Sequence, residues 1–584
     1  MATITIDPVN RIEGHLKATV TVNDISGVVS DAAITGNLFR GFELIMNRRD
    51  PRDAPQITQR ICAVCPTGHG IASVMCLDSA LGITNDPGTT GTNGDMPSGY
   101  SSTVPDNGRI IRNIIHGMDT VMSHITHLYQ LSALDFINTT TFPGMAPFLP
   151  SYTASDMIDG STGLGSTLVV HYVQALAMRR KCHTAGALFS GRQPIQNAMV
   201  PGGVTTLFSS TYPLSPQSGT DYDLYGPYNA SDTKAKFKAL LLEIRNFING
   251  TYLPDVVTVA NNYPAFWSQG VGCGRLLSYG EFPTNSTGTL AIKRGVATGL
   301  VLSNFDQANV KEYVANSYYN YGILDPAALH PFDGETNPNM GSGGYSWLKA
   351  PRFMSGTTPL VCEVGPLARM VITHLNGSTV QAYDGDTATV GVRVGGAYTV
   401  SNLVTTALGL VTQPATSLYS ALGRHAARAL EAKFLADAMA GSGGGVTSWV
   451  DQLVPNAPCY TYKRIPKQIS TGYGLTEAPR GALGHWIKIE GRKVQKYQCV
   501  VPTTWNASPK DALGQNGPAE QALIGSTIGT NSTDQIVTIL RILHTFDFCI
   551  ACAIHVVNPE GKDMLKFAIG PDGRPTNIEV SELA

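Results

Sequence analysis

Two short stretches near opposite ends of the chain decide what the fold must bring together: RICAVCPTGH, residues 60–69, and DFCIACAIH, residues 547–555. Each stretch contains two cysteines separated by two residues. The first pair is Cys62 and Cys65, and the second is Cys549 and Cys552. Four thiolates in two such pairs can bind zinc, an iron–sulfur cluster or another soft metal.

The spacing of the two pairs leaves several kinds of site open. A structural zinc site usually takes its two cysteine pairs from segments within ~15–20 residues of each other. Here almost the whole chain lies between the pairs. Structural zinc, a catalytic metal, thioredoxin-like redox pairs and unrelated thiols all remain possible interpretations on spacing alone.

Composition excludes some classes of protein. The chain has 584 residues and a net charge of −2, so no general attraction to nucleic acid or anionic lipid is expected. Only 14% of the residues are charged and 61 are glycine, which favours a subunit with a large partner interface. No apolar run reaches the ~18 residues that a membrane span needs. The N-terminal residues MATITIDPVN lack the features of a signal peptide.

The periodicity of apolar residues predicts a mixed α and β, helix-rich fold with β segments near both termini. Residues 84–108 are rich in Gly, Pro, Asn and Thr and are expected to form a loop, as is the glycine-rich run at 441–446. Strands are expected at residues 3–7, 15–22 and 387–394, and helices at 109–137, 167–189, 233–248, 417–441 and 532–547.

Several residues in other polar motifs could serve a metal site. Glu13 and Glu43 carry carboxylates, Arg480 follows Pro479, and His555 comes three residues after Cys552. Thr503 and Thr504 add hydroxyl groups. Each has an ordinary alternative, since a single carboxylate is usually solvated or ion-paired and a single arginine usually belongs to a structural ion pair.

Taken together, these motifs resemble the large subunit of nickel–iron hydrogenases, and in particular its uptake type. The resemblance covers essentially the whole chain, with additional loop residues near 84–108. It rests on DPVNRIEGH (7–15), RICAVCPTGHG (60–70), HLYQLSALDF (127–136), YSWLKAPRF (345–353), EVGPLARM (363–370), EAPRGALGHW (477–486), VVPTTWN (500–506) and DFCIACAIH (547–555).

The resemblance implies the fold and the activity. The fold would have a central bundle of long helices. Residues 1–555 would form the catalytic domain, and 556–584 a C-terminal extension removed on maturation. The chain would split hydrogen heterolytically at a buried nickel–iron centre and pass electrons to the iron–sulfur clusters of a small subunit. A distant relative, the quinone-site subunit of respiratory complex I, lacks the four cysteines. A complex-I-like scaffold subunit and a structural zinc protein are the two alternatives.

The resemblance also implies the metal ligands. Cys62 and Cys549 would bind nickel terminally, whereas Cys65 and Cys552 would bridge nickel and iron. The iron would carry carbon monoxide and cyanide. Soft thiolates suit a redox-active nickel, which holds them deprotonated.

Further residues have roles by the same resemblance. Arg480 and Thr503 would bind the cyanide ligands, with Pro479 packed beside them. Cys549 or Arg480 would accept the proton from hydrogen, although a guanidinium normally stays protonated. Glu13 would relay that proton toward solvent, since burial can raise the pKa of a carboxyl group toward the working pH.

A magnesium site and a processing step are implied at the C-terminus. Glu43, the backbone carbonyl of Cys499 and His555 would bind magnesium. A maturation endopeptidase would cut after His555 once metal-insertion chaperones have delivered the nickel. Turn residues on either side of a strand-like run predict a hairpin in the extension, and a permanent edge hairpin is the alternative.

The partners follow from what the chain lacks. The six remaining cysteines are scattered, so no set is left to bind iron–sulfur clusters, and a small subunit must supply them in a heterodimer. Export with that subunit would place the enzyme in the periplasm or at the membrane, where a cytochrome could accept electrons. A cytoplasmic location is the alternative.

Three residues depart from the usual family pattern. Ala63 and Phe548 stand where Gly and Pro are common, and Ser123 stands where many members have Asp. An aspartate at position 123 would help to orient Arg480.

Overall fold

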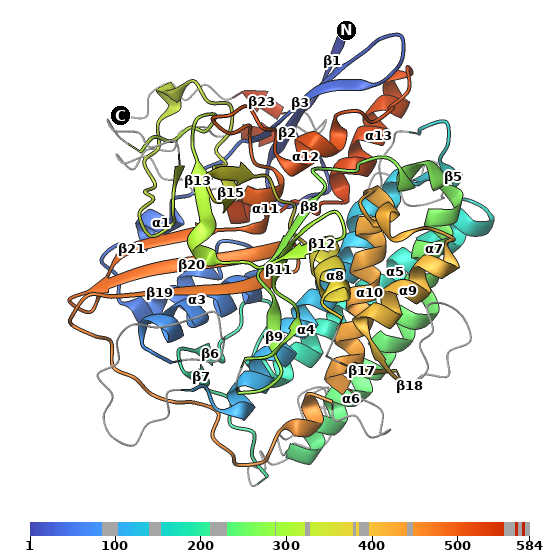
Figure 1. The fold of residues 1–584 in the computed structure, drawn as a ribbon. Coiled ribbons are helices and arrows are strands. Elements are labelled where there is room, and N and C mark those ends of the chain that lie inside the picture. The colour runs from blue at the N-terminus through green and yellow to red at the C-terminus, as the bar shows by residue number, and fades with distance from the viewer. Residues whose placement is uncertain are drawn as a thin grey trace.

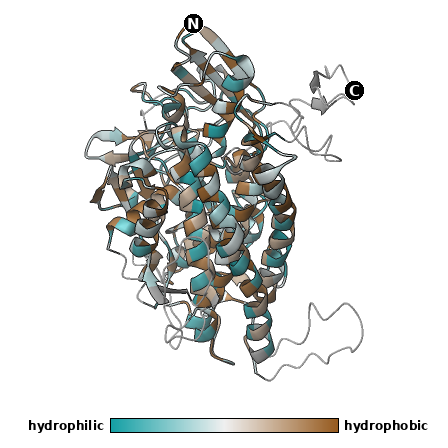
Figure 2. Cartoon of the chain, turned by 90° about the vertical axis from the view of Figure 1, so that its right-hand side faces the viewer, coloured by the Kyte–Doolittle hydropathy of each residue, from teal (hydrophilic) through white to brown (hydrophobic). Residues whose placement is uncertain are grey.

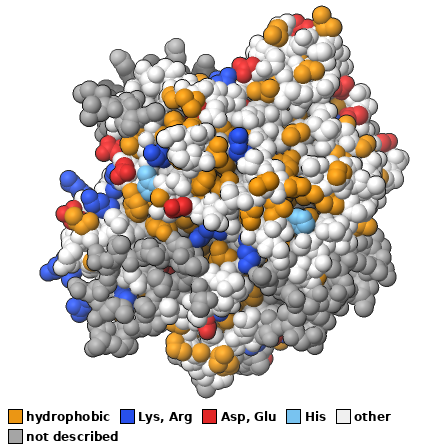
Figure 3. Space-filling view, viewed as in Figure 1, with side chains coloured by type: hydrophobic (Ala, Val, Ile, Leu, Met, Phe, Trp, Pro, Cys, Tyr) orange, Lys and Arg blue, Asp and Glu red, His pale blue; other side chains and the backbone are white. Residues whose placement is uncertain are grey.

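The computed structural model describes residues 1–83, 103–138, 153–210, 230–286, 288–321, 328–377, 381–384, 396–440, 448–553, 567–569 and 575–577. None of the helices within these ranges is long and apolar enough to cross a membrane. On the face of the molecule in Figure 3, hydrophobic side chains are spread over the middle and charged side chains are sparse.

Four long helices form a bundle on one side of the molecule (Figure 1). They are α4 (Asp106–Thr126), α5 (Gly163–Ser190), α6 (Ala230–Phe247) and α10 (Ala421–Ala440). The largest core cluster lies among them, and Figure 2 shows these helices from the side with hydrophobic residues along their length. The expected helical bundle is confirmed.

The structure corrects the start and end of the helix expected at residues 109–137. Helix α4 begins at Asp106, so the last three residues of the expected loop are helical. After Thr126 the chain tightens through a π-helical turn at His127–Ser132 and a 3-10 turn at Ala133–Asp135. Residues 84–102 of the expected loop, the expected strand at 387–394 and the loop at 441–446 lie outside the described residues.

The N-terminal strands are confirmed and pair in sequence order. The antiparallel sheet consists of β1 (Ala2–Ile6), β2 (Leu16–Val22) and β3 (Val29–Gly36). Strand β2 alternates buried and half-buried residues, because one face of the sheet packs on the core.

A second antiparallel sheet, which confirms the β segments expected toward the C-terminus, forms the platform beside the first cysteine pair. It consists of β19 (Ser470–Ala478), β20 (Gly481–Glu490) and β21 (Lys493–Val500), and α3 (Pro66–Ala80) packs against it. Two glycines of β19 allow this close packing. A Cβ atom on Gly472 would lie 2.3 Å from the Ala80 backbone nitrogen, and one on Gly474 would lie 2.2 Å from the Ala72 carbonyl oxygen.

The C-terminal segment returns to the N-terminus. Helix α13 (Ser532–His544) is followed by the short helix α14 (Ile550–Ala553), and between them the chain forms a parallel β-bridge with Glu13. The Glu13 nitrogen donates to the Phe548 carbonyl at 3.2 Å, and the Ile550 nitrogen donates to the Glu13 carbonyl at 2.7 Å. Backbone pairing therefore places the second cysteine pair next to the first 13 residues.

The remaining elements surround these parts. The expected hairpin of the C-terminal extension is confirmed as β22 (Phe567–Ile569) paired with β23 (Pro575–Asn577). The other helices are α1 (Phe42–Ile45), α2 (Ala54–Thr58), α7 (Leu253–Asn262), α8 (Pro366–Leu375), α9 (Val400–Leu410), α11 (Pro502–Asn506) and α12 (Pro518–Leu523). The other strands are β4 (Ile137–Asn138), β5 (Ile158–Asp159), β6 (Met199–Val200), β7 (Gly203–Val204), β8 (Arg275–Ser278), β9 (Glu281–Pro283), β10 (Leu290–Ile292), β11 (Gly295–Thr298), β12 (Val301–Ser303), β13 (Val310–Tyr313), β14 (Ala328–Leu329), β15 (Ala350–Ser355), β16 (Thr358–Leu360), β17 (Gln381–Asp384) and β18 (Gly396–Thr399).

Candidate metal centre

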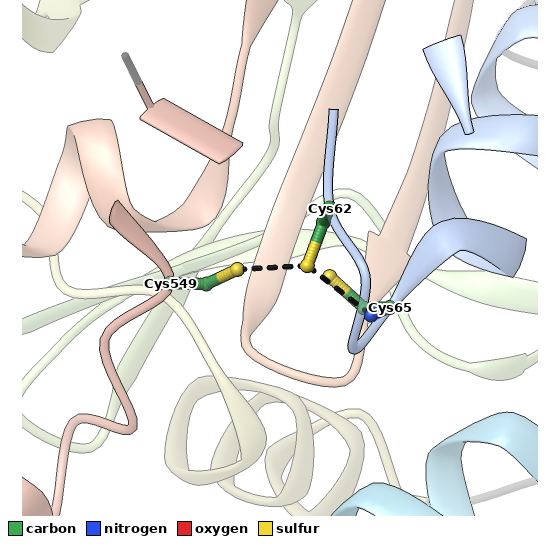
Figure 4. A group of neighbouring side chains, drawn as sticks. All are labelled: Cys62, Cys65 and Cys549. Carbon is green, nitrogen blue, oxygen red and sulfur yellow. Dashed lines mark hydrogen bonds between the residues drawn. The ribbon is translucent and has the colours of Figure 1, made fainter. Parts of the chain in front are cut away.

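Three of the four cysteines meet at one buried point. The sulfur atoms of Cys62, Cys65 and Cys549 all lie within 4.8 Å of one another, and Cys62 Sγ is 3.0 Å from Cys549 Sγ. Figure 4 shows them pointing toward a common centre from opposite ends of the chain. Cys552 lies in α14, one turn after Cys549, and its side chain is outside the described residues. The three sulfur atoms form a thiolate cluster that suits a soft metal.

Local backbone geometry favours the ionised form of the first pair. The backbone nitrogens of Val64 and Cys65 each donate to Cys62 Sγ at 3.2 Å. Cys65 is also the N-cap of α3, and Pro66 occupies the first helical position. Donated N–H groups and a helix N-terminus both stabilise a thiolate. The sequence Cys-x-x-Cys-Pro therefore places N–H donors beside Cys62 and a helix N-terminus beside Cys65, and metal ligation requires the deprotonated form of both.

Glu13 lies directly against the cluster. Its Oε2 atom is 3.2 Å from Cys549 Sγ and accepts a hydrogen bond from the Ala551 nitrogen at 2.9 Å. Burial raises the pKa of Glu13, and the Cys62 thiolate raises it further, although the hydrogen bonds from Cys549 and Ala551 act in the opposite direction. The side chain is only half-buried, so it lies between the cluster and the surface.

Arg480 is held at the tip of the β19–β20 hairpin, directly after Pro479. Its Nη2 atom forms an ion pair with Asp547 Oδ1 at 2.9 Å, and both side chains are almost fully buried. Burial alone would lower the pKa of Arg480, but Asp547 and the thiolates of Cys549, Cys65 and Cys62 raise it well above its usual range. Its Nε and Nη1 atoms have no hydrogen-bond partner in the described part of the chain. Two buried donors are thus left for an acceptor at the metals.

Thr503 and Pro479 reach the same region through backbone contacts. Thr503 Oγ1 accepts a hydrogen bond from the Cys549 nitrogen at 2.9 Å, so the hydroxyl fixes the backbone of a ligand. The Pro479 carbonyl accepts from Arg369 Nη2 at 2.9 Å, which anchors the hairpin tip. Arg480 and Thr503 could together donate hydrogen bonds to small ligands with nitrogen acceptors.

Glu43 and Cys499 also lie together, as the sequence motifs predicted. Glu43 is 3% exposed, and its Oε1 atom accepts a hydrogen bond from the Cys499 nitrogen at 2.8 Å. Its Oε2 atom accepts from the Thr336 hydroxyl. His555, the third residue expected here, lies outside the described residues.

The structure adds two carboxylates that sequence reasoning missed. Asp547 has a positive φ of 55° two residues before Cys549, and it pairs with Arg480. Asp119 is 4% exposed on α4, one helical turn before Ser123, and it interacts electrostatically with Cys62 and Arg480. Asp547 was recognisable only from its place beside the second cysteine pair. Asp119 could have been found as an acidic residue in the middle of the long helix expected at residues 109–137.

The three departures from the family pattern have different surroundings. Ala63 is exposed at the turn between the first two cysteines. Phe548 is 1% exposed and stacks on Phe546 with ring centroids 5.7 Å apart. Ser123 is buried, and its hydroxyl has no hydrogen-bond partner among the described residues.

A buried thiolate cluster built from both ends of a helix-rich chain defines a metalloprotein of the soft-metal class. The sequence pattern of a family described as nickel-dependent hydrogenase matches residues 40–93, 95–144 and 143–555, and a pattern described as HoxL-like matches residues 3–35. The chain therefore belongs to the nickel-dependent hydrogenases, as the large, catalytic subunit of a hydrogen-oxidising enzyme.

Individual relatives agree over nearly the full length. The chain is 36% identical to the periplasmic NiFeSe hydrogenase large subunit of Desulfomicrobium baculatum, over 95% of each chain. It is 32% identical to the uptake hydrogenase large subunit of Rhodobacter capsulatus, over 96% of each. A reduced, active NiFeSe hydrogenase structure from D. baculatum superposes with a TM-score of 0.76 at 35% identity, covering 95% of this chain and 100% of the other.

Proposed function

We propose that Cys62, Cys65, Cys549 and Cys552 hold a nickel–iron centre whose iron carries carbon monoxide and cyanide. The observation that carries this proposal is the thiolate cluster, in which three sulfur atoms from opposite ends of the chain lie within 4.8 Å of one another. When bound, the centre supplies the redox capacity and Lewis acidity that split hydrogen heterolytically. Elemental analysis should find nickel and iron, and infrared spectra should show bands of metal-bound carbon monoxide and cyanide. Zinc alone would overturn the proposal.

Cys549 is the proton acceptor that the contacts favour. Arg480 is the alternative base, but its neighbours raise its pKa well above the usual range, so it stays a cation. The Cys549 thiol is 3.2 Å from the Glu13 carboxylate, a distance suited to direct proton transfer. Glu13 then passes the proton toward the surface, because its side chain is only half-buried.

Arg480 and Thr503 hold the cyanide ligands, with Pro479 beside them. The two unpartnered guanidinium nitrogens among the described residues support this role for Arg480. Asp547 fixes the guanidinium by an ion pair of 2.9 Å, so the donors are oriented before any ligand binds.

Magnesium binds at Glu43, the Cys499 carbonyl and His555. The support is that the Glu43 carboxylate touches the Cys499 backbone in a buried position. Because Glu43 already accepts two hydrogen bonds, it is fixed in place as a preformed oxygen ligand for a hard cation. Magnesium removal by a chelator should lower thermal stability.

An iron–sulfur small subunit accepts the electrons, and the enzyme is exported with it to the periplasm or the membrane, where a cytochrome is the next acceptor. The names of the relatives, which include uptake and periplasmic large subunits, support this assignment. Helix α5 supports a protein partner, because Val170, Val173 and Leu176 form an exposed apolar stripe along it. Purification of the tagged chain should recover the small subunit.

Residues 556–584 are removed by an endopeptidase after chaperones insert the nickel. The family match ends at residue 555, which supports a boundary there. The physical reason is access, since Cys549 is buried and its segment must stay open until the metals are loaded. Intact mass spectrometry of the active enzyme should find a chain that ends at His555. Full activity from a chain ending at Ala584 would reject cleavage.

A further inference from the structure

Helix α4 carries a continuous polar stripe through the interior of the molecule. Nearly all of the helix is buried, yet polar side chains recur every three or four residues on one face. With a rise of 1.5 Å per residue, the stripe extends over about 25 Å. Its members are Asp106, Arg109, Arg112, Asn113, His116, Asp119 and Ser123.

The inner end of the stripe faces the thiolate cluster, because Asp119 interacts electrostatically with Cys62 and Arg480. Ser123 Oγ and both carboxylate oxygens of Asp119 are buried. None of them makes a hydrogen bond of normal geometry within the described ranges, although the Thr67 hydroxyl lies beside the Asp119 carboxylate. Burial raises the pKa of Asp119 to about 7. His116 lowers it, Cys62 raises it, and Arg480 and the Thr67 hydroxyl lower it. Buried polar atoms of this kind are normally satisfied by ordered water.

The middle of the stripe is a histidine–carboxylate pair. His116 Nε2 lies 2.9 Å from Glu281 Oε2 and 2.7 Å from the Glu477 carbonyl oxygen, so Nε2 carries the hydrogen. His116 Nδ1 and Glu281 Oε1 are buried and have no partner within the described part of the structure. In each residue one polar atom is hydrogen-bonded and the other has no partner among the described residues. A proton could therefore enter at one atom of the pair and leave at another.

The outer end opens into a cavity that reaches the surface. The cavity measures about 50 Å³, and its polar lining includes His116, Glu281, Asn113 and Arg112. One water needs only ~10–15 Å³ of such volume, so the cavity can hold a few waters. Arg109 lines its rim and pairs at 2.9 Å with Asp106, whose side chain is 67% exposed.

We propose that this α4 passage, defined by Ser123, Asp119, His116, Glu281 and the cavity beyond them, holds a chain of water molecules that exchanges protons between the thiolate cluster and the surface. The proposal rests on the proposed hydrogenase chemistry and adds a second exit beside Glu13. Asp119 and Ser123 hydrogen-bond the innermost waters, whereas His116 and Glu281 transfer the proton.

The transfer conserves atoms and charge. A hydronium ion at Asp119 gives a proton to His116 Nδ1 and becomes water, while the Nε2–H bond breaks and that proton bonds to Oε2 of the ionised Glu281 carboxylate. Rotation of the carboxyl group about its Cγ–Cδ bond brings the same proton to a cavity water, which accepts it and leaves Glu281 ionised. Exchange of the ring protons with water then returns the imidazole to its Nε2–H tautomer. No electron moves, and no co-reactant other than water is needed.

The functional test is a double-mutant cycle between the two exits, with both subunits present. The rate of exchange between hydrogen and heavy water measures proton passage at the centre. His116→Gln keeps a hydrogen-bond donor toward Glu281, but an amide cannot accept a proton at one nitrogen and release one from another as the imidazole ring can. In the Glu13→Gln background, we expect His116→Gln to lower the residual exchange at least about tenfold, against about threefold or less in the wild-type background.

The control is a half-buried histidine–carboxylate pair outside the passage. His171 Nδ1 on α5 lies 2.8 Å from Asp255 Oδ2 on α7. His171→Gln in the Glu13→Gln background should leave exchange unchanged. If His116→Gln has no larger effect than this control, the passage is overturned, whatever the effect of Glu13→Gln alone. That single variant tests the Glu13 relay separately.

A structural measurement makes the test independent of turnover. A high-resolution crystal structure of the heterodimer should show water within hydrogen-bond distance of Asp119, His116 Nδ1 and Glu281 Oε1. Infrared bands of the centre should be the same in His116→Gln as in the wild type. A passage without ordered water would reject a conducting role. Infrared bands shifted in His116→Gln would also reject it, because the slower exchange would then come from a change at the centre.

Discussion

Glu13 and Asp119 are two carboxylates that act on the same thiolates from very different surroundings. Glu13 lies on an N-terminal loop, half-buried, and its Oε2 atom contacts Cys549 Sγ and the Ala551 nitrogen. Asp119 lies inside α4, 4% exposed, with both oxygens unpartnered among the described residues. The first carboxylate can exchange a proton with a ligand directly, whereas the second can do so only through water.

The difference is the basis for the two kinds of proton exit that we propose for one thiolate cluster. Burial is the largest influence on the pKa of both carboxyl groups and raises both values. The hydrogen bonds from Cys549 and Ala551 lower the pKa of Glu13, whereas the pKa of Asp119 is lowered first by the charge of His116, then by Arg480 and by the Thr67 hydroxyl. A short, direct exit therefore needs few groups, and a long exit through a helix bundle needs a polar stripe.

The largest expected effect comes from removing a thiolate of the cluster with which both carboxylates interact. Cys65→Ser or Cys552→Ser should abolish the centre, because a bridging thiolate holds both metals and serine is a much weaker soft-metal ligand. The nickel content measured by elemental analysis should fall to background. Cys182→Ser, at a buried cysteine on α5, is the control and should keep its nickel. Wild-type nickel in either ligand variant would refute the ligand assignment.

Replacing the directly bonded carboxylate should have the next largest effect. Glu13→Gln can keep the hydrogen bond from the Ala551 nitrogen, but it cannot accept the proton of Cys549. Hydrogen oxidation should slow on the order of a hundredfold. The metals and their infrared bands should be retained. Near-normal turnover would remove Glu13 from the proton path.

A change at Arg480 affects both carboxyl groups, since the charge of Arg480 lowers the pKa of Glu13 and of Asp119. Arg480→Lys should keep assembly but lose activity about tenfold or more, because lysine cannot present the same planar fork of donors. Shifted cyanide bands should accompany the loss. Arg52→Lys, at an exposed pair with Asp50, is the matched control. Unchanged turnover and bands would place Arg480 outside the metal chemistry.

Asp119→Asn should have a smaller effect than Glu13→Gln. The amide can still bind the passage waters, and the direct exit through Glu13 remains, so we expect exchange with heavy water to fall about threefold or less. An effect as large as that of Glu13→Gln would contradict the proposed division between a main exit and an auxiliary exit.

Sequence motifs identified residues that the fold brings together better than they identified the structure that holds them. Cys62, Cys65, Cys549 and Glu13 were identified because their chemistry is visible in short motifs, and the structure brings them together. Helices with long apolar repeats were also predictable, with boundaries wrong by a few residues. Helix α4 starts three residues earlier than expected because Pro105 is favoured just before the first turn and Asp106 within it.

The missed parts depend on contacts between distant segments. β segments toward the C-terminus were predicted, but strand β19 was not, because Gly472 and Gly474 interrupt it. These glycines weaken the strand signal but allow α3 to approach. Asp119 was missed because an acidic residue on one face of a helix gives no hint of what it faces. Only the fold shows that it lies near Cys62 and Arg480.

The smallest expected effect on activity comes from a third buried carboxylate, which lies outside the metal centre. Glu520 accepts hydrogen bonds from the backbone nitrogens of Ile34 and Gly517 and from the Tyr345 hydroxyl. Burial raises its pKa to about 7, from an ordinary value of 4.5. Between these values the folded chain keeps a proton that the unfolded chain releases. The stabilisation is therefore complete below about pH 4.5 and is lost as the pH rises through about 7.

Glu520→Gln should remove this pH dependence while leaving hydrogen oxidation unchanged. The shift corresponds to about 3 kcal/mol of unfolding free energy between the two ends of the interval. The wild type should thus lose more thermal stability than the variant when the pH is raised from about 5 to about 8. Melting temperatures of both proteins at the two pH values measure the difference. Equal losses would show that the Glu520 carboxyl group has an ordinary pKa in the folded chain. Lower turnover in Glu520→Gln would show that buried carboxylates remote from the thiolates also affect the chemistry. The effects of Glu13 and Asp119 variants could then not be attributed to their positions near the thiolates.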